Sequence, residues 1–183
     1  MKLKLTPTLA TALIAAAALA ALAAPAHLAA ASPSAPAVPG NLVPPQGNKL
    51  FLTADAEGVQ IYRCDAGAST WTLVAPRADL FAANGHLLGT HYAGPSWEAR
   101  DGSLVTGSRV DGVNMDPAAV DWLLLVKKTT AAGPDGDRLA ATTYIQRVDT
   151  TGGRAPAAGE CDVTGETAEV PYTATYHFWK ATS

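Results

Sequence analysis

Short apolar segments separated by turn residues make up the chain from residue 48 onward, and this spacing constrains the fold more than any other feature. No window there keeps a helical period for more than one or two turns. Asn84-Gly85 and Asp101-Gly102 are dipeptides typical of tight hairpin turns, and each lies between two apolar stretches. Roughly nine short strands joined by turns are typical of all-β sandwiches and barrels. The sequence therefore predicts a mainly β, single-domain antiparallel β-sandwich or β-barrel with few or no helices.

The strands are expected where apolar residues alternate with polar ones or form short runs. Gln60 and Tyr62 alternate with two apolar residues, which is the pattern of a half-buried strand. The run 122–126 is continuously apolar and fits a strand covered on both faces. Pro76 is expected to end a strand. Further strands are expected at 50–53, 71–74, 80–81, 87–88, 97–99, 104–105, 139–148 and 170–179, the last with Tyr172, Ala174, Tyr176 and Phe178 on one face.

The first thirty residues have the three-part layout of a secretory signal peptide. Lys2 and Lys4 precede a long Ala/Leu-rich run, and small residues suited to cleavage follow at 24–26 and 29–31. A membrane anchor is the alternative, but the run barely reaches the roughly 20 apolar residues that cross a bilayer. No cysteine lies near the cleavage positions and no Arg-Arg pair precedes the run, which favours the general secretory route. We expect residues 1–30 to be cleaved and the protein to be secreted, periplasmic or part of the cell envelope.

Residues 31–47 are rich in proline and alanine and are expected to form an extended linker. One β-rich domain then occupies residues 48–183. The full chain has a formal charge of −3, and losing the two N-terminal lysines with the signal peptide shifts it to −5. Nucleic acid and anionic lipid both need a basic surface, so neither is expected as a partner. No integral membrane anchor is expected after cleavage, and the sequence specifies no oligomeric state.

Two cysteines, Cys64 and Cys161, remain in the exported chain. In an oxidising compartment an even count favours a structural disulfide. Such a bridge closes a loop of roughly 100 residues, worth on the order of 4–5 kcal/mol in the chain-entropy estimate. A redox pair and metal ligation are the alternatives, but the chain has no Cys-x-x-Cys and neither cysteine has a neighbouring histidine.

Residues 89–103 gather a histidine, two aromatic residues, two carboxylates and an arginine. A Gly-Pro break within them can fold the chain back and bring His91 towards Glu98 or Asp101. These three are the candidate catalytic residues, acting as general acid and base in a hydrolase or lyase. A metal site is a weaker alternative. The plainer interpretation is structural, with Trp97 in the core and Glu98 paired with an arginine.

A site for a carbohydrate or another small ligand is the functional interpretation that we favour for this segment. Tyr92 and Trp97 offer stacking faces, and neighbouring polar side chains can fix hydroxyl groups. Arg147 lies among strand residues and needs a partner if it is buried, for which Glu98, Asp101 and Asp149 are available. The candidate ligand-binding residues are Gln60, Tyr62, His91, Trp97, Glu98, Asp101 and Arg147.

Other kinds of site have little support in the sequence. His86 and His91 are five positions apart, so a continuous strand points them to opposite faces. No Gly-x-Ser-x-Gly nucleophile motif is present. The glycine pair at 152–153 follows a strand but opens no helix, so it does not form a phosphate-binding turn. We expect no metal site and no cofactor.

Several motifs along the chain occur together in one known family. They are Gly58-Val59-Gln60-Ile61-Tyr62-x-Cys64, Ala75-Pro76-x-Ala78-x-Leu80, Gly89-x-His91-Tyr92-Ala93-Gly94-Pro95-x-Trp97-Glu98, Asp121-Trp122-Leu123-Leu124-Leu125, Tyr144-Ile145-Gln146-Arg147-Val148-x-Thr150-x-Gly152-Gly153 and Pro171-Tyr172-x-Ala174-x-Tyr176-x-Phe178. With these motifs the chain resembles the exported bacterial and fungal proteins grouped as domain of unknown function 3455, over about residues 40–179. The resemblance implies secretion and a single β-rich domain, and it carries no established activity. One departure is Asp149, where the family pattern usually has asparagine.

Three functions follow as hypotheses. The first is a non-enzymatic exported module that binds a carbohydrate or another small ligand. The second is a hydrolase or lyase that uses His91 with Glu98 or Asp101. The third is a structural protein of the cell envelope or surface with no ligand. The sequence does not decide whether the protein is an enzyme, although it favours a non-enzymatic role.

Overall fold

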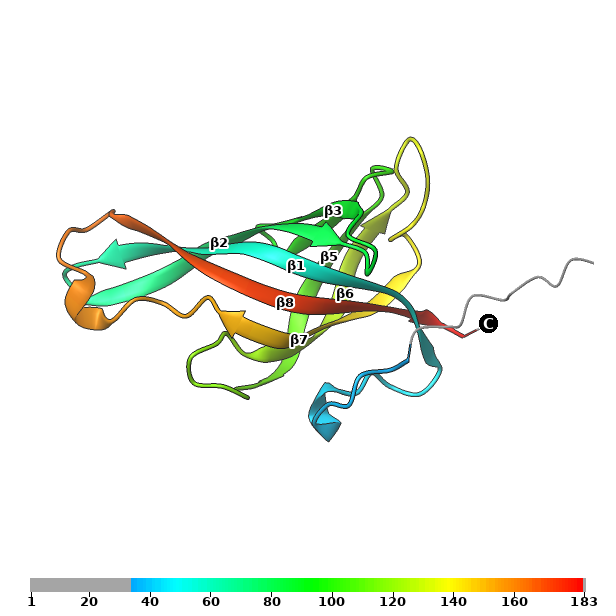
Figure 1. Cartoon of the computed structure of the whole chain (residues 1–183), viewed down its shortest axis with the longest axis horizontal. Coiled ribbons are helices and arrows are strands. Elements are labelled where there is room, and N and C mark those ends of the chain that lie inside the picture. Colours follow the sequence, from blue (N-terminus) through cyan, green and yellow to red (C-terminus); the bar gives the residue numbers. More distant parts are fainter. Residues whose placement is uncertain (1–33, 183) are drawn as a thin grey trace, which may run out of the picture. The chain divides into compact units, whose positions relative to one another are not determined.

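The computed structural model describes residues 34–182, which contain eight strands and two single-turn 3-10 helices (Figure 1). The predicted signal peptide at 1–30 and the first residues of the predicted linker lie outside the described residues. The short helices are η1 (Gly40–Leu42) and η2 (Ala158–Glu160). The strands are β1 (Asn48–Asp65), β2 (Thr70–Phe81), β3 (Leu87–Tyr92), β4 (Ser96–Ala99), β5 (Leu104–Val113), β6 (Trp122–Ala131), β7 (Thr142–Gly152) and β8 (Thr167–Ala181).

Each strand pairs antiparallel with the next strand along the chain, and β1 also pairs with β8. The sheet therefore closes into a barrel, an arrangement that removes free sheet edges. This confirms the predicted mainly β, antiparallel, single-domain fold and selects the barrel over the sandwich. β1, β2 and β8 are longer than the other strands, and their far ends continue together as a ribbon (Figure 1).

The strands are fewer and longer than the sequence predicts. The segments 50–53 and 58–64 belong to one strand, β1, and β2 runs without interruption through Pro76. Pro76 is tolerated because β2 has no β3 partner at this position, since pairing between these strands begins only at Ala78. The expected strand at 139–148 begins instead at Thr142. The predicted turns at 84–85 and 101–102 are both present, and Gly85 and Gly102 have positive φ angles.

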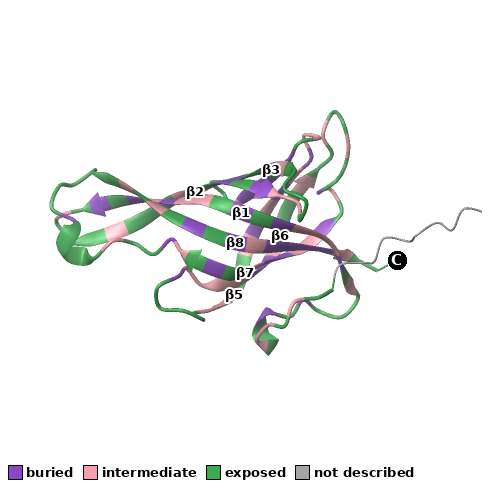
Figure 2. Ribbon diagram, in the orientation of Figure 1, coloured by how far each residue is buried: buried purple, intermediate pink, exposed green. Residues whose placement is uncertain are grey.

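Inward-facing side chains from all parts of the chain fill the barrel. Buried and less buried residues alternate along much of β1 and along β8 up to Tyr176, whereas residues 176–179 of β8 are all buried (Figure 2). The predicted inward set of Tyr172, Ala174, Tyr176 and Phe178 is buried. Gly107 on β5 gives Trp97 its space, because a Cβ atom there would lie 3.2 Å from the indole ring. A larger residue at 107 would therefore press on the indole ring, and the ring would have to shift slightly.

The segment before β1 packs on the outside of the barrel. Leu42 of η1 is fully buried, and η1 contacts β5 and β6. The Gln146 side chain donates to the Leu42 carbonyl at 2.7 Å and accepts from Trp179 Nε1 at 2.8 Å. The predicted two-sided burial of the 122–126 strand is confirmed, because Leu125 faces the barrel interior while Leu124 is buried on the outer face.

The predicted disulfide is present between Cys64, near the end of β1, and Cys161, which follows η2. Their Cα atoms are 5.3 Å apart, and 97 positions separate them in the sequence. The bridge ties the far end of the β1–β2 ribbon to the loop before β8. Within residues 34–182, no helix has the length and apolar character to cross a membrane.

Candidate functional site

A cavity of about 400 Å³ occupies the barrel interior beside the point where β2 separates from β3. Its inner wall consists of buried side chains, and its mouth is formed by half-exposed residues of β2. Cavities of this size accommodate small organic ligands. The lining residues are Gln60, Leu73, Val74, Ala75, Pro76, His91, Ala93, Gly94, Pro95, Trp97, Arg109, Leu123, Leu125, Arg147 and Tyr176.

Three aromatic rings form the inner wall of the cavity. The rings of His91 and Trp97 stack, with centroids 4.6 Å apart and planes 12° from parallel. Tyr176 from β8 contacts both rings, with its centroid 5.0 Å from that of His91 and 5.5 Å from that of Trp97. The β3–β4 pairing places His91 directly opposite Trp97, which is why these two residues meet. Stacked and edge-to-face contacts of this kind hold each ring in a defined orientation.

His91 is held neutral inside the barrel. Its Nδ1 lies 2.8 Å from the Ser96 carbonyl oxygen, so this nitrogen carries the proton and donates it. Burial lowers the pKa of His91 to about 3, and the positive charge of Arg147 acts in the same direction. The neutral ring then has a lone pair on Nε2. His91 is therefore a hydrogen-bond acceptor towards its surroundings and carries no charge near neutral pH.

Several buried polar atoms of the cavity wall find no hydrogen-bond partner among the described residues. They are Gln60 Nε2 and Trp97 Nε1, while the hydroxyls of Tyr172 and Tyr176 lie beside each other and beside Arg147 without a hydrogen bond of ordinary geometry. A buried donor without a partner costs roughly 1–3 kcal/mol of stability. Native proteins satisfy more than nine in ten such groups, so this cluster requires an explanation. Ordered water or a bound ligand with matching groups would satisfy it.

Arg147 lies on the inner face of β7 and reaches the cavity from one side. Its Nε and Nη2 donate to the backbone carbonyl of Asp121, at 3.0 and 2.8 Å. None of the carboxylates that the sequence offers as partners, Glu98, Asp101 and Asp149, forms an ion pair with this arginine within residues 34–182. Burial raises the pKa of Tyr176, and the guanidinium of Arg147 opposes that shift. Arg147 therefore leaves its positive charge unneutralised by any bonded carboxylate.

The structure brings four of the predicted ligand-binding residues together in this cavity, namely Gln60, His91, Trp97 and Arg147. Tyr62 lies next to them in a second hollow of about 350 Å³, which also involves Arg147 and Arg154. The Tyr62 hydroxyl donates to the Gly153 carbonyl at 2.6 Å, so it is already satisfied.

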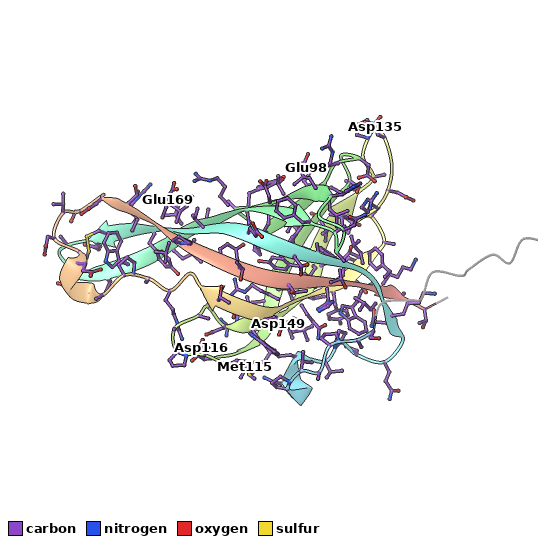
Figure 3. The ribbon with its side chains drawn as sticks, viewed as in Figure 1. Glu98, Met115, Asp116, Asp135, Asp149 and Glu169 are labelled. Carbon is purple, nitrogen blue, oxygen red and sulfur yellow. A yellow bond between two sulfur atoms is a disulfide. The ribbon has the colours of Figure 1, made fainter. Side chains whose placement is uncertain are left out.

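Glu98 and Asp101 do not share the cavity with His91. The β3–β4 register pairs Glu98 with Thr90 and Trp97 with His91, so Glu98 points to the outer face of the sheet (Figure 3). There it accepts a hydrogen bond from Tyr92 at 2.8 Å and does not pair with an arginine. His91 is thus not joined to this carboxylate.

Asp101 has a structural position in the turn between β4 and β5. Its carboxylate accepts from the Ser103 amide at 3.0 Å and from the Arg138 amide at 2.9 Å. The hydrogen bonds from the Ser103 hydroxyl and the Arg138 amide lower the pKa of Asp101 below its usual value. The carboxylate anchors the loop before β7. No aspartate or glutamate lines the cavity, and residues 34–182 contain no cluster of three or more His, Cys, Asp or Glu side chains suited to a metal ion.

Sequence reasoning left several cavity residues unassigned. Tyr176 was predicted to face inward but was given no role, and its place in the 172–178 alternation was the available signal. Arg109, Leu73 and Val74 had no such signal, because their position at the mouth depends on where β2 separates from β3.

Fold and site together define a closed eight-stranded antiparallel barrel with an internal cavity of ligand size, whose mostly apolar wall carries a few buried polar groups. The chain belongs to the family described as protein of unknown function (DUF3455), whose profile matches residues 44–180. The resemblance inferred from the sequence motifs is thereby confirmed. No curated protein and no solved structure matches the chain.

Proposed function

We propose that this protein is an exported, non-enzymatic module that holds a small ligand inside its barrel. The observation that carries the proposal is the pair of unpartnered buried polar atoms Gln60 Nε2 and Trp97 Nε1, on residues that line one cavity of about 400 Å³ together with Tyr176. A ligand that bonds to these atoms would recover the stability that their burial costs.

Binding is favoured over acid–base catalysis by the contents of the cavity. A general acid–base pair needs two titratable groups within reach of one substrate. His91 is neutral and its Nδ1 is engaged with a backbone carbonyl, while Glu98 faces the outside and Asp101 anchors a turn. The cavity therefore offers orientation and polar recognition, with no carboxylate beside the histidine.

Export is supported by the signal-like N-terminal sequence and by the Cys64–Cys161 disulfide, since such bridges persist mainly in oxidising compartments. Mass spectrometry of the native protein tests this part. We expect the mature chain to begin between residues 27 and 32 and to be found outside the cytoplasm. An intact N-terminus on a cytoplasmic protein would contradict export.

Replacing Tyr176 by phenylalanine tests the binding function. Tyr176 Oη lies beside Tyr172 and Arg147 without a hydrogen bond of ordinary geometry, so Tyr176→Phe should lower the unfolding free energy by less than Tyr62→Phe does, and should weaken ligand binding. Tyr62→Phe is the matched control, because it removes a hydroxyl that donates to Gly153 and should cost about 1 kcal/mol. Urea denaturation gives the stabilities, and a thermal-shift screen of small polar, acidic and sugar compounds detects binding.

Two results would contradict the proposal. One is a stability loss in Tyr176→Phe as large as that in Tyr62→Phe, which would show that the hydroxyl is satisfied by structural water. The other is the absence of a thermal shift with every compound class, which would favour the structural envelope protein.

A further inference from the structure

We propose that the ligand is a small organic carboxylate with an apolar body, bound with its carboxylate in the barrel and its apolar part at the mouth. This inference rests on the binding function proposed above and adds the chemical class and the orientation of the ligand. Three properties of the cavity carry it: the donor character of its inner wall, its charge, and the apolar residues at its mouth.

The inner wall presents hydrogen-bond donors in excess. The indole nitrogen of Trp97 and the guanidinium of Arg147 can only donate, and the unpartnered atom of Gln60 is its amide nitrogen. The Tyr176 hydroxyl can donate as well. The neutral acceptors of the wall are His91 Nε2, the Tyr176 hydroxyl oxygen and the Gln60 amide oxygen, and none of them carries a negative charge. A ligand that satisfies this wall must therefore bring acceptors, and a carboxylate brings two oxygens with several lone pairs.

The charge around the cavity is positive, although the chain as a whole is acidic. Arg109 and Arg147 line the cavity without any lining carboxylate. Asp121 is shared among the neighbouring guanidinium groups, with its carboxylate oxygens 3.7 Å from Arg109 and 3.9 Å from Arg154. The Asp121 carboxylate thus lies near two half-exposed arginines that are partly screened by water, whereas Arg147 bonds only to the Asp121 backbone carbonyl. The half-buried Arg147 can therefore pair with one negatively charged group of a ligand.

The mouth of the cavity is mostly apolar, with the exposed side chain of Arg109 as its charged member. Leu73 and Val74 have relative exposures of 49% and 48%, and Pro76, Pro95 and Leu123 line the same opening. Single exposed apolar residues are ordinary on protein surfaces, but several around one opening indicate contact with an apolar partner. Because the unpartnered donors and Arg147 lie deep and the rim is apolar apart from Arg109, the proposed orientation places the carboxylate inward.

Calorimetric titration of the purified mature protein with octanoate, methyl octanoate and 1-octanol tests this orientation and charge. These probes share a similar alkyl chain, and octanoate alone carries the negative charge. Octanoate should bind at least about tenfold more tightly than either neutral compound, because a charge-assisted hydrogen bond to Arg147 is lost in both. Hexanoate should bind more weakly than octanoate, because less apolar surface is buried at the mouth.

Two variants locate the site. Arg147→Gln should weaken octanoate binding about tenfold or more and leave 1-octanol binding unchanged. Arg63→Gln is the matched control, because Arg63 is exposed on β1 outside the cavity. This variant should bind octanoate as tightly as the wild type does. If Arg147→Gln does not fold, the comparison of octanoate with its methyl ester on the wild type still decides the charge requirement.

The outcomes separate this inference from the function on which it rests. Binding of 1-octanol, methyl octanoate or a sugar such as N-acetylglucosamine as tightly as octanoate would retain a ligand-binding barrel and overturn the carboxylate. Equal octanoate affinity in Arg147→Gln and Arg63→Gln would also overturn it. No heat signal and no shift of the Trp97 indole resonance with any of these probes would overturn the carboxylate, and together with a negative thermal-shift screen of every compound class it would contradict the binding function as well.

Discussion

Acid should destabilise this protein through His91. The histidine is 3% exposed, and burial lowers its pKa to about 3, against an ordinary value near 6.5. Between pH 6.5 and pH 3, His91 is therefore mostly protonated in the unfolded chain and mostly neutral in the folded barrel. The stabilising contribution of neutral His91 is complete above pH 6.5, and it is lost progressively as the pH falls towards 3.

The size of the effect follows from this gap in pKa. Each pH unit inside the window removes about 1.4 kcal/mol, so lowering the pH from 7 to 4.5 should cost about 2–3 kcal/mol through His91 alone. Burial also lowers the pKa of His177, which adds a loss of the same sign. The contribution of His91 must therefore be measured as a difference between the wild type and a variant.

His91→Asn is the suitable variant, because its side-chain amide can replace the donor to the Ser96 carbonyl while removing the titratable ring. Urea denaturation at pH 7 and pH 4.5 gives the unfolding free energies. The variant should be less stable at pH 7, by about 1–3 kcal/mol for the lost packing against Trp97, but should lose about 2–3 kcal/mol less than the wild type on acidification. His86→Asn, which removes an exposed histidine in the β2–β3 turn, is the control. Parallel pH profiles for His91→Asn and the wild type would refute the reasoning.

Three further predictions concern the fold. Replacing both Cys64 and Cys161 by serine should lower the unfolding free energy by up to about 4–5 kcal/mol, because the bridge closes a loop of 97 positions, and dithiothreitol should have the same effect on the wild type in urea titrations. Leu42→Ala should lower the unfolding free energy by about 2–5 kcal/mol, since Leu42 is fully buried although it precedes the barrel. An unchanged unfolding free energy would mean that this segment does not pack on the barrel in solution. Asp149 has a φ angle of 49° beside a bulge in β7, a conformation that asparagine tolerates and valine does not. Asp149→Asn should therefore keep or slightly raise the melting temperature, and Asp149→Val should lower it. Equal melting temperatures for the two variants would contradict backbone strain at this position.

Much of the barrel was predictable because local patterns and turn residues agree with it. The alternation at 97–100 places Trp97 and Ala99 on one face and Glu98 and Arg100 on the other, and the structure has the first pair buried and the second exposed. The disulfide follows from the cysteine count and the expected compartment. Strand ends were less predictable, because pairing with neighbours carries β2 through Pro76 where local chemistry indicates a stop.

The cavity was less accessible to sequence reasoning. Alternation along the strand places Gln60 on one face of the sheet and its neighbours Val59 and Ile61 on the other. It does not say which face lies inside the barrel, and in the structure the Gln60 side chain is the buried one. In the same way, the residues 89–103 contain His91, Trp97 and Glu98, but the β3–β4 register decides which of them meet. A slip of one residue would have exchanged Trp97 and Glu98.

The sequence by itself determines the strand-forming segments, their turns, the disulfide and the family, because each depends on residues close together or on a count. The tertiary structure alone decides that the sheet closes, that its polar faces turn inward near one cavity, and that Gln60, Trp97, Arg147 and Tyr176 meet there. These residues come from four strands spread over more than a hundred positions, and their meeting depends on long-range pairing and register. The local preferences of the residues do not specify long-range strand pairing or its register.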